Sequence, residues 1–258
     1  MSVGTLVHDY TGRVALVTGG TRGLGAGVAR AFAAAGARVV VCARKDTGDA
    51  PGHFLPCDVR DPEDVARLMD DIRAEYGRLD VVVNNAGGGP YAPVAEAPPR
   101  LLQRVIELNL LGPLYVARAA YPLMDEGAIV MVGSVSGTRP SPGTAAYGAA
   151  KAGLHHLAAC LAAEWAPKVR VNTVVVGLAE SGDDQAEHYG GEETLRAIRE
   201  TVPAGRLAGP DDVAAACLYL ASAPHVTGST LTLDGGGEQA AWQYLVQRNQ
   251  TGGAPNAL

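Results

Sequence analysis

Several features that would mark other classes of protein are missing from this 258-residue sequence. No apolar run approaches the length of about 20 residues that a membrane-spanning helix requires. Basic residues form no cluster, and the formal net charge of −6 gives no attraction to nucleic acid or to an anionic membrane surface. Residues 1–10 lack both the basic and the apolar segment of a signal peptide. We therefore predict a cytoplasmic protein with no nucleic-acid partner and no membrane partner.

Cysteine is also scarce, which limits the cross-links and metal sites that the chain can form. The four cysteines, Cys42, Cys57, Cys160 and Cys217, are far apart in the sequence, and none belongs to a C-x-x-C pair. Each lies in an apolar stretch. This pattern favours reduced thiols in the core of an intracellular protein over disulfides or a structural metal site.

What is present is a regular alternation of short apolar runs and helical patterns. Apolar residues make up 47% of the chain and charged residues 19%, as in folded globular proteins. We predict strands over residues 13–18, 38–42, 53–57, 79–83, 128–132, 169–175 and 229–233. We predict helices over residues 23–35, 62–76, 100–123, 146–165 and 211–222.

Strands that are apolar at nearly every position, each followed by a helix, indicate a parallel sheet covered on both faces. No linker or repeat divides the chain. We therefore predict an α/β fold of the doubly wound, Rossmann type, with a seven-stranded parallel sheet, in a single domain over residues 1–258.

A glycine-rich segment, residues 18–25 (TGGTRGLG), connects the first predicted strand to the first predicted helix. Backbone N–H groups and the positive end of a helix dipole attract a pyrophosphate at such a place, and glycine lets the ligand approach the backbone. The spacing is G-x-x-x-G-x-G and not the common G-x-G-x-x-G. A tight turn between strand and helix is the alternative interpretation.

Further motifs follow in order at later strand ends, and together they resemble the short-chain dehydrogenase/reductase family. That family's T-G-x-x-x-G-x-G loop is matched by residues 18–25, and its N-N-A-G motif by residues 84–87. Its aspartate on the adenine side is matched by Asp58, and its Y-x-x-x-K pair by Tyr147 and Lys151.

The resemblance extends from about residue 13 to residue 236. It implies an NAD(P)(H)-dependent oxidoreductase that interconverts a ketone or aldehyde with an alcohol. It also implies a homo-oligomer, a dimer or a tetramer, formed partly through the helices that carry Asn109 and Tyr147.

The choice between NAD and NADP is usually made at the end of the second strand. NAD enzymes carry a carboxylate there, whereas a nearby arginine accommodates the 2′-phosphate of NADP. Here Ala43 stands at the position of the carboxylate, Arg44 follows it, and Arg22 lies in the glycine loop. Asp46 is close enough to complicate this assignment. We predict that NADP(H) is the preferred cofactor and that NAD(H) is possible. The predicted cofactor-binding residues are Gly19, Thr21, Arg22, Gly23, Leu24, Gly25, Arg44, Lys45, Asp58, Val59, Asn85, Ala86, Gly87, Tyr147, Lys151, Gly177 and Ser181.

The predicted catalytic residues are Asn109, Ser134, Tyr147 and Lys151. Tyr147 and Lys151 are one helical turn apart, so their side chains leave the same face of the helix. A tyrosine phenol ordinarily has a pKa of about 10, and a neighbouring ammonium would stabilise its phenolate. By resemblance, Tyr147 is the general acid in reduction, and Lys151 binds the nicotinamide ribose. By resemblance too, Ser134 (with Ser136 as a rival) binds the substrate oxygen, and Asn109 holds a water that links to the lysine.

Residues 177–203 match the family's mobile lid over the substrate, and they depart from the family pattern. Val176 replaces the usual proline before Gly177, and Ser181 replaces a threonine that contacts the carboxamide. Six carboxylates and His188 lie within residues 180–193. A solvated outer face is the favoured interpretation of this acidic segment, and a cationic substrate or a metal site is the alternative.

Two further features bear on specificity and assembly. Arg139 could meet an anionic substrate or face solvent. The tail, residues 235–258, extends beyond the family's common ending, and its apolar residues are expected to pack on a neighbouring subunit. These residues are Trp242, Tyr244, Leu245 and Val246.

Three functions are compatible with these motifs. The first is an NADPH-dependent carbonyl reductase acting on 3-oxoacyl thioesters, hydroxysteroids, polyketide intermediates or small cyclic alcohols. The second is an NAD-linked alcohol dehydrogenase. The third is a non-catalytic dinucleotide-binding sensor or scaffold, since a fold alone does not imply activity.

Overall fold

Seven parallel strands form one sheet in the computed structural model, which describes residues 8–180, 191–238 and 246. The strand order is β3-β2-β1-β4-β5-β6-β7. The bounds are β1 Val14–Thr18, β2 Arg38–Ala43, β3 His53–Pro56, β4 Val81–Asn84, β5 Gly127–Ser134, β6 Val169–Val176 and β7 Thr230–Leu233. The order reverses direction between β1 and β4, and ligands of open α/β sheets bind outside the carboxyl ends of the strands at such a point.

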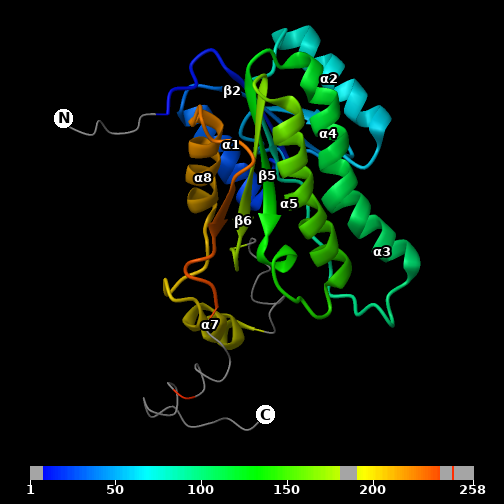
Figure 1. The fold of residues 1–258 in the computed structure, drawn as a ribbon, viewed down its shortest axis with the longest axis vertical. Coiled ribbons are helices and arrows are strands. Elements are labelled where there is room, and N and C mark those ends of the chain that lie inside the picture. Colours follow the sequence, from blue (N-terminus) through cyan, green and yellow to red (C-terminus); the bar gives the residue numbers. More distant parts are fainter. Residues whose placement is uncertain (1–7, 181–190, 239–245, 247–258) are drawn as a thin grey trace, which may run out of the picture.

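Helices cover both faces of the sheet, as Figure 1 shows. The helices are α1 Gly23–Ala34, α2 Pro62–Tyr76, α3 Pro99–Ile106, α4 Gly112–Ala120, α5 Ala145–Trp165, α7 Glu192–Thr201 and α8 Pro210–Ser222. One core cluster joins α1 and α8 to the sheet, and a second joins α2, α4 and α5 to its other face. The predicted Rossmann-type, doubly wound α/β fold is confirmed. Among the residues that the structure describes, no helix is long and apolar enough to cross a membrane.

The segment predicted as one helix over residues 100–123 is divided into four pieces. Between α3 and α4 lies a π-helical turn, η1 Glu107–Leu111, and a short 3-10 turn, η2 Tyr121–Leu123, follows α4. Pro113 has no N–H group and therefore cannot donate to the carbonyl of Asn109, as an α-helix requires. The N–H of Gly112 instead reaches back to the carbonyl of Glu107. The sequence pattern missed this interruption because both pieces keep the same apolar face.

The polar segment 177–203 contains a helix, α7, that was not predicted. Leu195 of α7 is buried together with Val202 and Leu207, in a small apolar cluster apart from the main core. Beside it, Ala179 and Ala208 form an isolated parallel bridge. In Figure 1, α7 lies at the carboxyl ends of the strands.

The prediction of four core thiols is correct for three cysteines and wrong for Cys160. Cys42, Cys57 and Cys217 are buried, whereas Cys160 is exposed on the outer face of α5. The alanine-rich sequence of α5 has a weak apolar period, so an apolar neighbourhood in sequence did not mean burial.

Candidate active site

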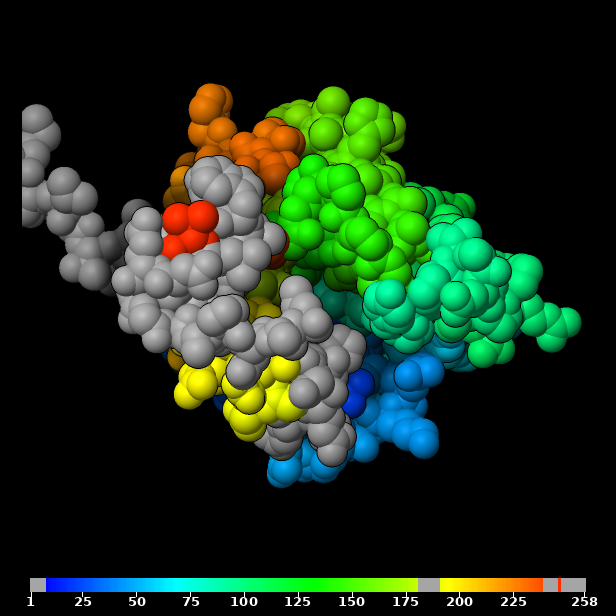
Figure 2. All heavy atoms as spheres, turned by 90° about the horizontal axis from the view of Figure 1, so that it is seen from below, coloured from blue at the N-terminus to red at the C-terminus, as the bar shows by residue number. Residues whose placement is uncertain are grey.

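A large cleft among the described residues lies at the carboxyl ends of the strands. It has a volume of about 1020 Å³, against about 310 and 330 Å³ for two cavities at the opposite edge of the sheet. Residues of β2, β5, β6, α1 and α5 line it, together with the loops that follow β1, β3, β4 and β6. Figure 2 looks onto this edge, with α7 (yellow) and the residues around 140 (green) on opposite sides of the recess.

The glycine loop enters this cleft, and its glycines let neighbouring segments of the chain pack closely. Gly19 has φ +64°, in the left-handed region, and a Cβ there would lie 3.0 Å from the Cα of Ala86. A Cβ on Gly25 would collide with the carbonyl oxygen of Gly19. At the start of α1 no side chain caps the helix, and no acidic residue occupies its first turn. Free N–H groups and the helix dipole therefore face the cleft, which fits a dinucleotide pyrophosphate.

The glycine loop is attached to the end of β4 by two polar side chains. Thr18 Oγ1 accepts hydrogen bonds from the backbone N–H groups of Asn85 and Ala86, each at 3.0 Å. The Asn85 amide donates to the carbonyl oxygens of Thr18 at 3.0 Å and Gly19 at 3.2 Å. These bonds hold two walls of the cleft together. Thr18 and Asn85 therefore shape the loop.

At the end of β2, two basic side chains lie at the cleft. Arg22 and Arg44 both line the cleft and are both exposed. Asp46 is engaged in a local turn, because its Oδ1 accepts from the N–H of Gly48 at 2.9 Å. Thr47 Oγ1 lies 3.4 Å from the carbonyl oxygen of Thr21, which joins this loop to the glycine loop.

Asp58 is held by an arginine that the sequence analysis did not single out. Arg60 forms a two-pronged ion pair with it, with Nε–Oδ1 at 2.9 Å and Nη2–Oδ2 at 2.5 Å. The bond from Arg60 lowers the pKa of Asp58, and Arg44 contributes as well. An arginine two residues after a strand-end aspartate is the sequence signal that was missed.

Asn109 is fully buried at the π-helical turn. Its Nδ2 donates to the carbonyl of Val105 at 2.9 Å, replacing the backbone bond that an α-helix would make there. The same amide donates to the carbonyl of Gly88 at 2.8 Å and accepts from its N–H at 2.9 Å. Asn109 thus connects the helix to the loop after β4. It lies behind the cleft wall, and its water link to the lysine stays a prediction.

Tyr147 and Lys151 line the cleft from α5, as their spacing predicted. Lys151 is 3% exposed, and its Nζ donates to the carbonyl of Val132 at 2.8 Å. Burial lowers the pKa of Lys151 to about 8. Its Nζ lies 5.7 Å from the centre of the Tyr147 ring, within the range of a cation–π interaction.

Ser134 ends β5 and also lines the cleft. Its Oγ accepts a hydrogen bond from the N–H of Ser136 at 3.2 Å. A hydroxyl that accepts from the backbone still has its own proton to donate to a substrate oxygen. The rival, Ser136, receives a hydrogen bond from the hydroxyl of Ser141 at 3.2 Å and does not line the cleft.

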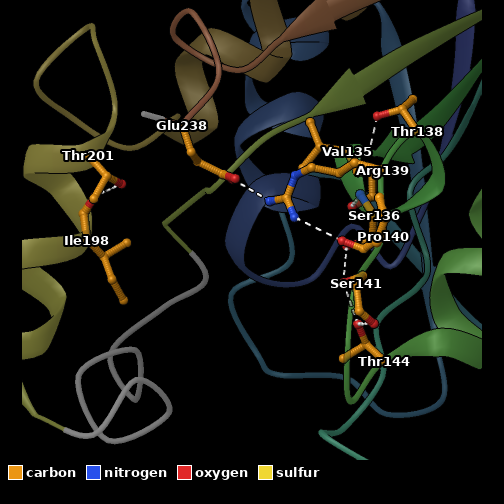
Figure 3. Close-up of polar contacts among 11 residues, drawn as sticks. Val135, Ser136, Thr138, Arg139, Pro140, Ser141, Thr144, Ile198, Thr201 and Glu238 are labelled. Carbon is orange, nitrogen blue, oxygen red and sulfur yellow. Dashed lines mark hydrogen bonds and ion pairs between the residues drawn. The ribbon is translucent and has the colours of Figure 1, made fainter. Parts of the chain in front are cut away.

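The loop after Ser136 is bound to the segment beyond β7. Arg139 Nη2 pairs with Glu238 Oε1 at 2.5 Å, as Figure 3 shows. In the same loop, the hydroxyls of Ser141 and Thr144 lie 2.6 Å apart. Arg139 is therefore not simply solvent-facing, one of the two outcomes weighed from the sequence. The other, contact with an anionic substrate, stays a prediction.

The structure brings together most of the predicted site. The predicted residues on the cleft wall are Gly19, Thr21, Arg22, Gly23, Leu24, Gly25, Arg44, Asp58, Val59, Asn85, Ala86, Gly87, Ser134, Tyr147, Lys151 and Gly177. Lys45 is exposed and does not line the cleft. Ser181, His188, Trp242, Tyr244 and Leu245 lie outside the described residues. Cleft residues that were not predicted are Cys42, Ala43, Cys57, Arg60, Gly88, Leu108, Val132, Gly133, Val176 and Ala179.

Within the described ranges, no three histidine, cysteine or acidic side chains are grouped as a metal site would require. The acidic segment that raised this alternative lies largely in residues 181–190, which are not described.

The chain is similar to proteins of known family over most of its length. A family model described as enoyl-(acyl carrier protein) reductase matches residues 19–238. The short-chain type dehydrogenase/reductase y4vI of Sinorhizobium fredii is 38% identical over 95% of this chain, which spans only 46% of that relative. The 3-oxoacyl-(acyl-carrier-protein) reductase FabG of Escherichia coli is 36% identical over 88% of this chain and 98% of its own length.

A solved structure shares the fold. The ligand-free aldohexose dehydrogenase AldT of Thermoplasma acidophilum matches with a TM-score of 0.86 at 30% identity. The match covers 89% of this chain and 95% of that one.

Proposed function

The chain belongs to the short-chain dehydrogenase/reductase family, as an oxidoreductase acting on CH–OH donors with NAD(P), and we propose that it works as an NADPH-preferring carbonyl reductase. The observation that carries the proposal is the meeting of Tyr147, Lys151 and Ser134 on one cleft with the glycine loop. A non-catalytic sensor has no need of this combination.

The three side chains have complementary roles in carbonyl reduction. The glycine loop, Arg22 and Arg44 would hold NADPH, which when bound would supply a hydride for the carbonyl carbon. Tyr147 gives its phenolic proton to the carbonyl oxygen, and the Ser134 hydroxyl donates a hydrogen bond to the same oxygen. The product is the alcohol.

Lys151 supports the tyrosine from one turn along α5. Its ammonium has three protons, one of which is given to the carbonyl of Val132. The others remain for the ribose hydroxyls of the cofactor and for stabilising the phenolate of Tyr147. Because burial brings the pKa of Lys151 to about 8, the group is mostly protonated near neutral pH.

The preference for NADPH rests on charges at the end of β2. Arg22 and Arg44 offer guanidinium groups to a 2′-phosphate, Ala43 cannot bind a ribose diol, and the Asp46 carboxylate is engaged with Gly48.

Turnover with a panel of ketones, diketones and 3-oxoacyl thioesters tests the proposal. One relative is named for a 3-oxoacyl substrate, which is why thioesters belong in the panel. We expect substrate-dependent loss of NADPH absorbance, slower with NADH, and abolished in Tyr147→Phe, which removes one hydroxyl and keeps the ring. Faster turnover with NADH would favour the NAD-linked alternative. Turnover that survives in Tyr147→Phe would overturn the assignment of the acid.

A further inference from the structure

A histidine on α5 supports the end of the strand that carries Ser134. β4 ends at Asn84, opposite Met131, so β5 continues past its neighbour on that side. Two backbone groups of this extension bind side chains of α5. The carbonyl of Val132 accepts from Lys151 Nζ at 2.8 Å, and the N–H of Ser134 donates to His155 Nε2 at 3.3 Å.

The spacing of the two side chains on α5 matches the spacing of the two backbone groups on β5. Lys151 and His155 are four residues apart, one turn along the same face of α5. Val132 and Ser134 are two residues apart, so their backbone groups point to the same edge of β5. The helix therefore binds the edge of β5 through one donor, Lys151 Nζ, and one acceptor, His155 Nε2, with matching spacing on the two elements.

The backbone around the imidazole is closely packed. A Cβ on Gly133 would collide with His155 Nε2, and one on Gly137 would lie 2.8 Å from His155 Cε1. Glycine at both positions lets the chain on either side of Ser134 lie directly against the ring.

On the basis of the proposed function, we infer that His155 is a positioning residue, which holds the Ser134 hydroxyl at the substrate oxygen only while its imidazole is neutral. Nε2 must be unprotonated to accept the Ser134 N–H, so the neutral ring carries its proton on Nδ1. A protonated ring would have no acceptor for that N–H.

The electrostatic surroundings favour the neutral ring near neutral pH. Burial and the positive charge of Lys151 both lower the pKa of His155. Neither β5 nor the 3-10 turn η3 Val135–Gly137, which pack against it, carries a charged side chain, and Arg170 of β6 lies toward the strand's opposite end. Activity is therefore full above the lowered pKa of His155 and falls as the pH decreases through it.

Three variants test this inference on the substrate that turns over best. His155→Leu removes the acceptor and should lower kcat about tenfold above the pKa of His155, the effect of one hydrogen bond, and this difference should disappear at lower pH, where the unchanged protein loses the same contact. His155→Gln keeps a carbonyl acceptor that does not titrate. We expect it to stay within about threefold of the unchanged protein near neutral pH and to lose the acid limb of the pH profile. His156→Gln, on the exposed face of the same helix, is the matched control and should change nothing.

NADPH affinity and thermal unfolding of each variant separate a positioning role from a folding defect. We expect the affinity to change by less than about twofold, since His155 does not line the cleft. Wild-type kcat in His155→Leu, or an acid limb that persists in His155→Gln, would overturn the inference.

The test can fail independently of the proposed function. If Tyr147→Phe is inactive but His155→Leu is fully active, only the positioning role is wrong. If no carbonyl substrate turns over, an NMR titration of the NADPH complex still decides the role. It should show His155 neutral with its proton on Nδ1 near neutral pH, and the opposite tautomer would refute it.

Discussion

One buried charged side chain lies at the amino ends of the strands, called here the amino edge, and another lies at their carboxyl ends, the carboxyl edge. The two charges differ in how neighbouring groups compensate them. At the amino edge, Asp80 is 3% exposed and accepts from Arg13 at 3.0 Å, from Arg78 at 3.0 Å and from the N–H of Val14 at 2.9 Å. Burial alone would raise the pKa of Asp80, but these hydrogen bonds hold it below its usual value.

At the carboxyl edge, Lys151 is equally buried and has no such compensation. Its Nζ donates to the carbonyl of Val132, and no carboxylate in the described part of the chain pairs with it. Burial moves its pKa toward neutrality, so folding disfavours its charge. A buried charge that is paired within the folded protein, as at Asp80, stabilises the fold. A buried charge without such partners, as at Lys151, is available to bind a ligand.

Replacing Lys151 should have the largest effect on catalysis and little cost in stability. We expect Lys151→Met to lower kcat/KM about 1000-fold, because Tyr147 loses the neighbouring ammonium. Since the change removes a poorly compensated buried charge, the free energy of unfolding near neutral pH should be unchanged or higher by about 1–3 kcal/mol. Steady-state kinetics and urea unfolding measure the two effects. A strongly destabilised variant would mean that Lys151 is structural.

Comparing Lys151→Met with the wild type measures how Lys151 makes the stability depend on pH. Between the folded-state pKa of about 8 and the ordinary value of 10.5, the unfolded chain binds a proton that the folded chain does not. The contribution of Lys151 to stability therefore rises with pH across this window, by about 3 kcal/mol in total. Lys151→Met should lack that rise. Parallel curves for the two proteins would contradict the depressed pKa.

Replacing Asp80 should have the opposite pattern of effects, a large loss of stability with no loss of catalysis. We expect Asp80→Asn to lower the free energy of unfolding by about 3 kcal/mol, because two arginines and a backbone N–H lose their charged acceptor. Its kcat/KM should match the wild type, since the cleft lies at the other edge. The contribution of Asp80 is complete above about pH 4 and is lost as the pH falls through its lowered folded-state pKa. Denaturant unfolding as a function of pH measures this, and loss of activity without loss of stability would break the comparison.

The adenosine end of the cleft gives a sharper test of which charges serve a ligand. Removing both guanidinium groups in Arg22→Ala/Arg44→Ala should weaken NADPH binding about 100-fold and leave NADH binding nearly unchanged. Calorimetric titration with each cofactor measures the two affinities. Equal losses for both cofactors would mean that the arginines shape the loop and do not bind a 2′-phosphate.

The smallest effect is expected at the Arg139–Glu238 ion pair. Its side chains are 42% and 27% exposed, so screening by solvent limits its contribution to below about 1 kcal/mol. Glu238→Gln should leave stability almost unchanged and raise kcat/KM about two- to fivefold for substrates with a carboxylate, because it releases the Arg139 guanidinium for an anionic group. The neutral members of the same panel serve as controls. An equal change for neutral and anionic substrates would exclude this role.

Much of the sheet and the glycine loop could be predicted because their signals are local. Runs such as Val81–Val83 are apolar at successive positions, and Tyr147 and Lys151 need only a helix to share a face. The remaining features depend on contacts between distant segments. The π-turn at Asn109 depends on its bonds with Gly88, and Arg139 meets Glu238 across 99 positions. In the sequence, nothing distinguishes His155 from other helix residues, because its contact with Ser134 forms only in the folded chain.

Cofactor binding tests the central claim most directly. Titration of the unmodified protein with NADPH and with NADH by calorimetry requires no knowledge of the substrate. We predict saturable binding of one NADPH per chain and binding of NADH that is weaker by about tenfold or more. If neither nucleotide binds, the cleft at the carboxyl edge is not a dinucleotide site, and the roles given to Lys151, Tyr147 and Ser134 are wrong as well.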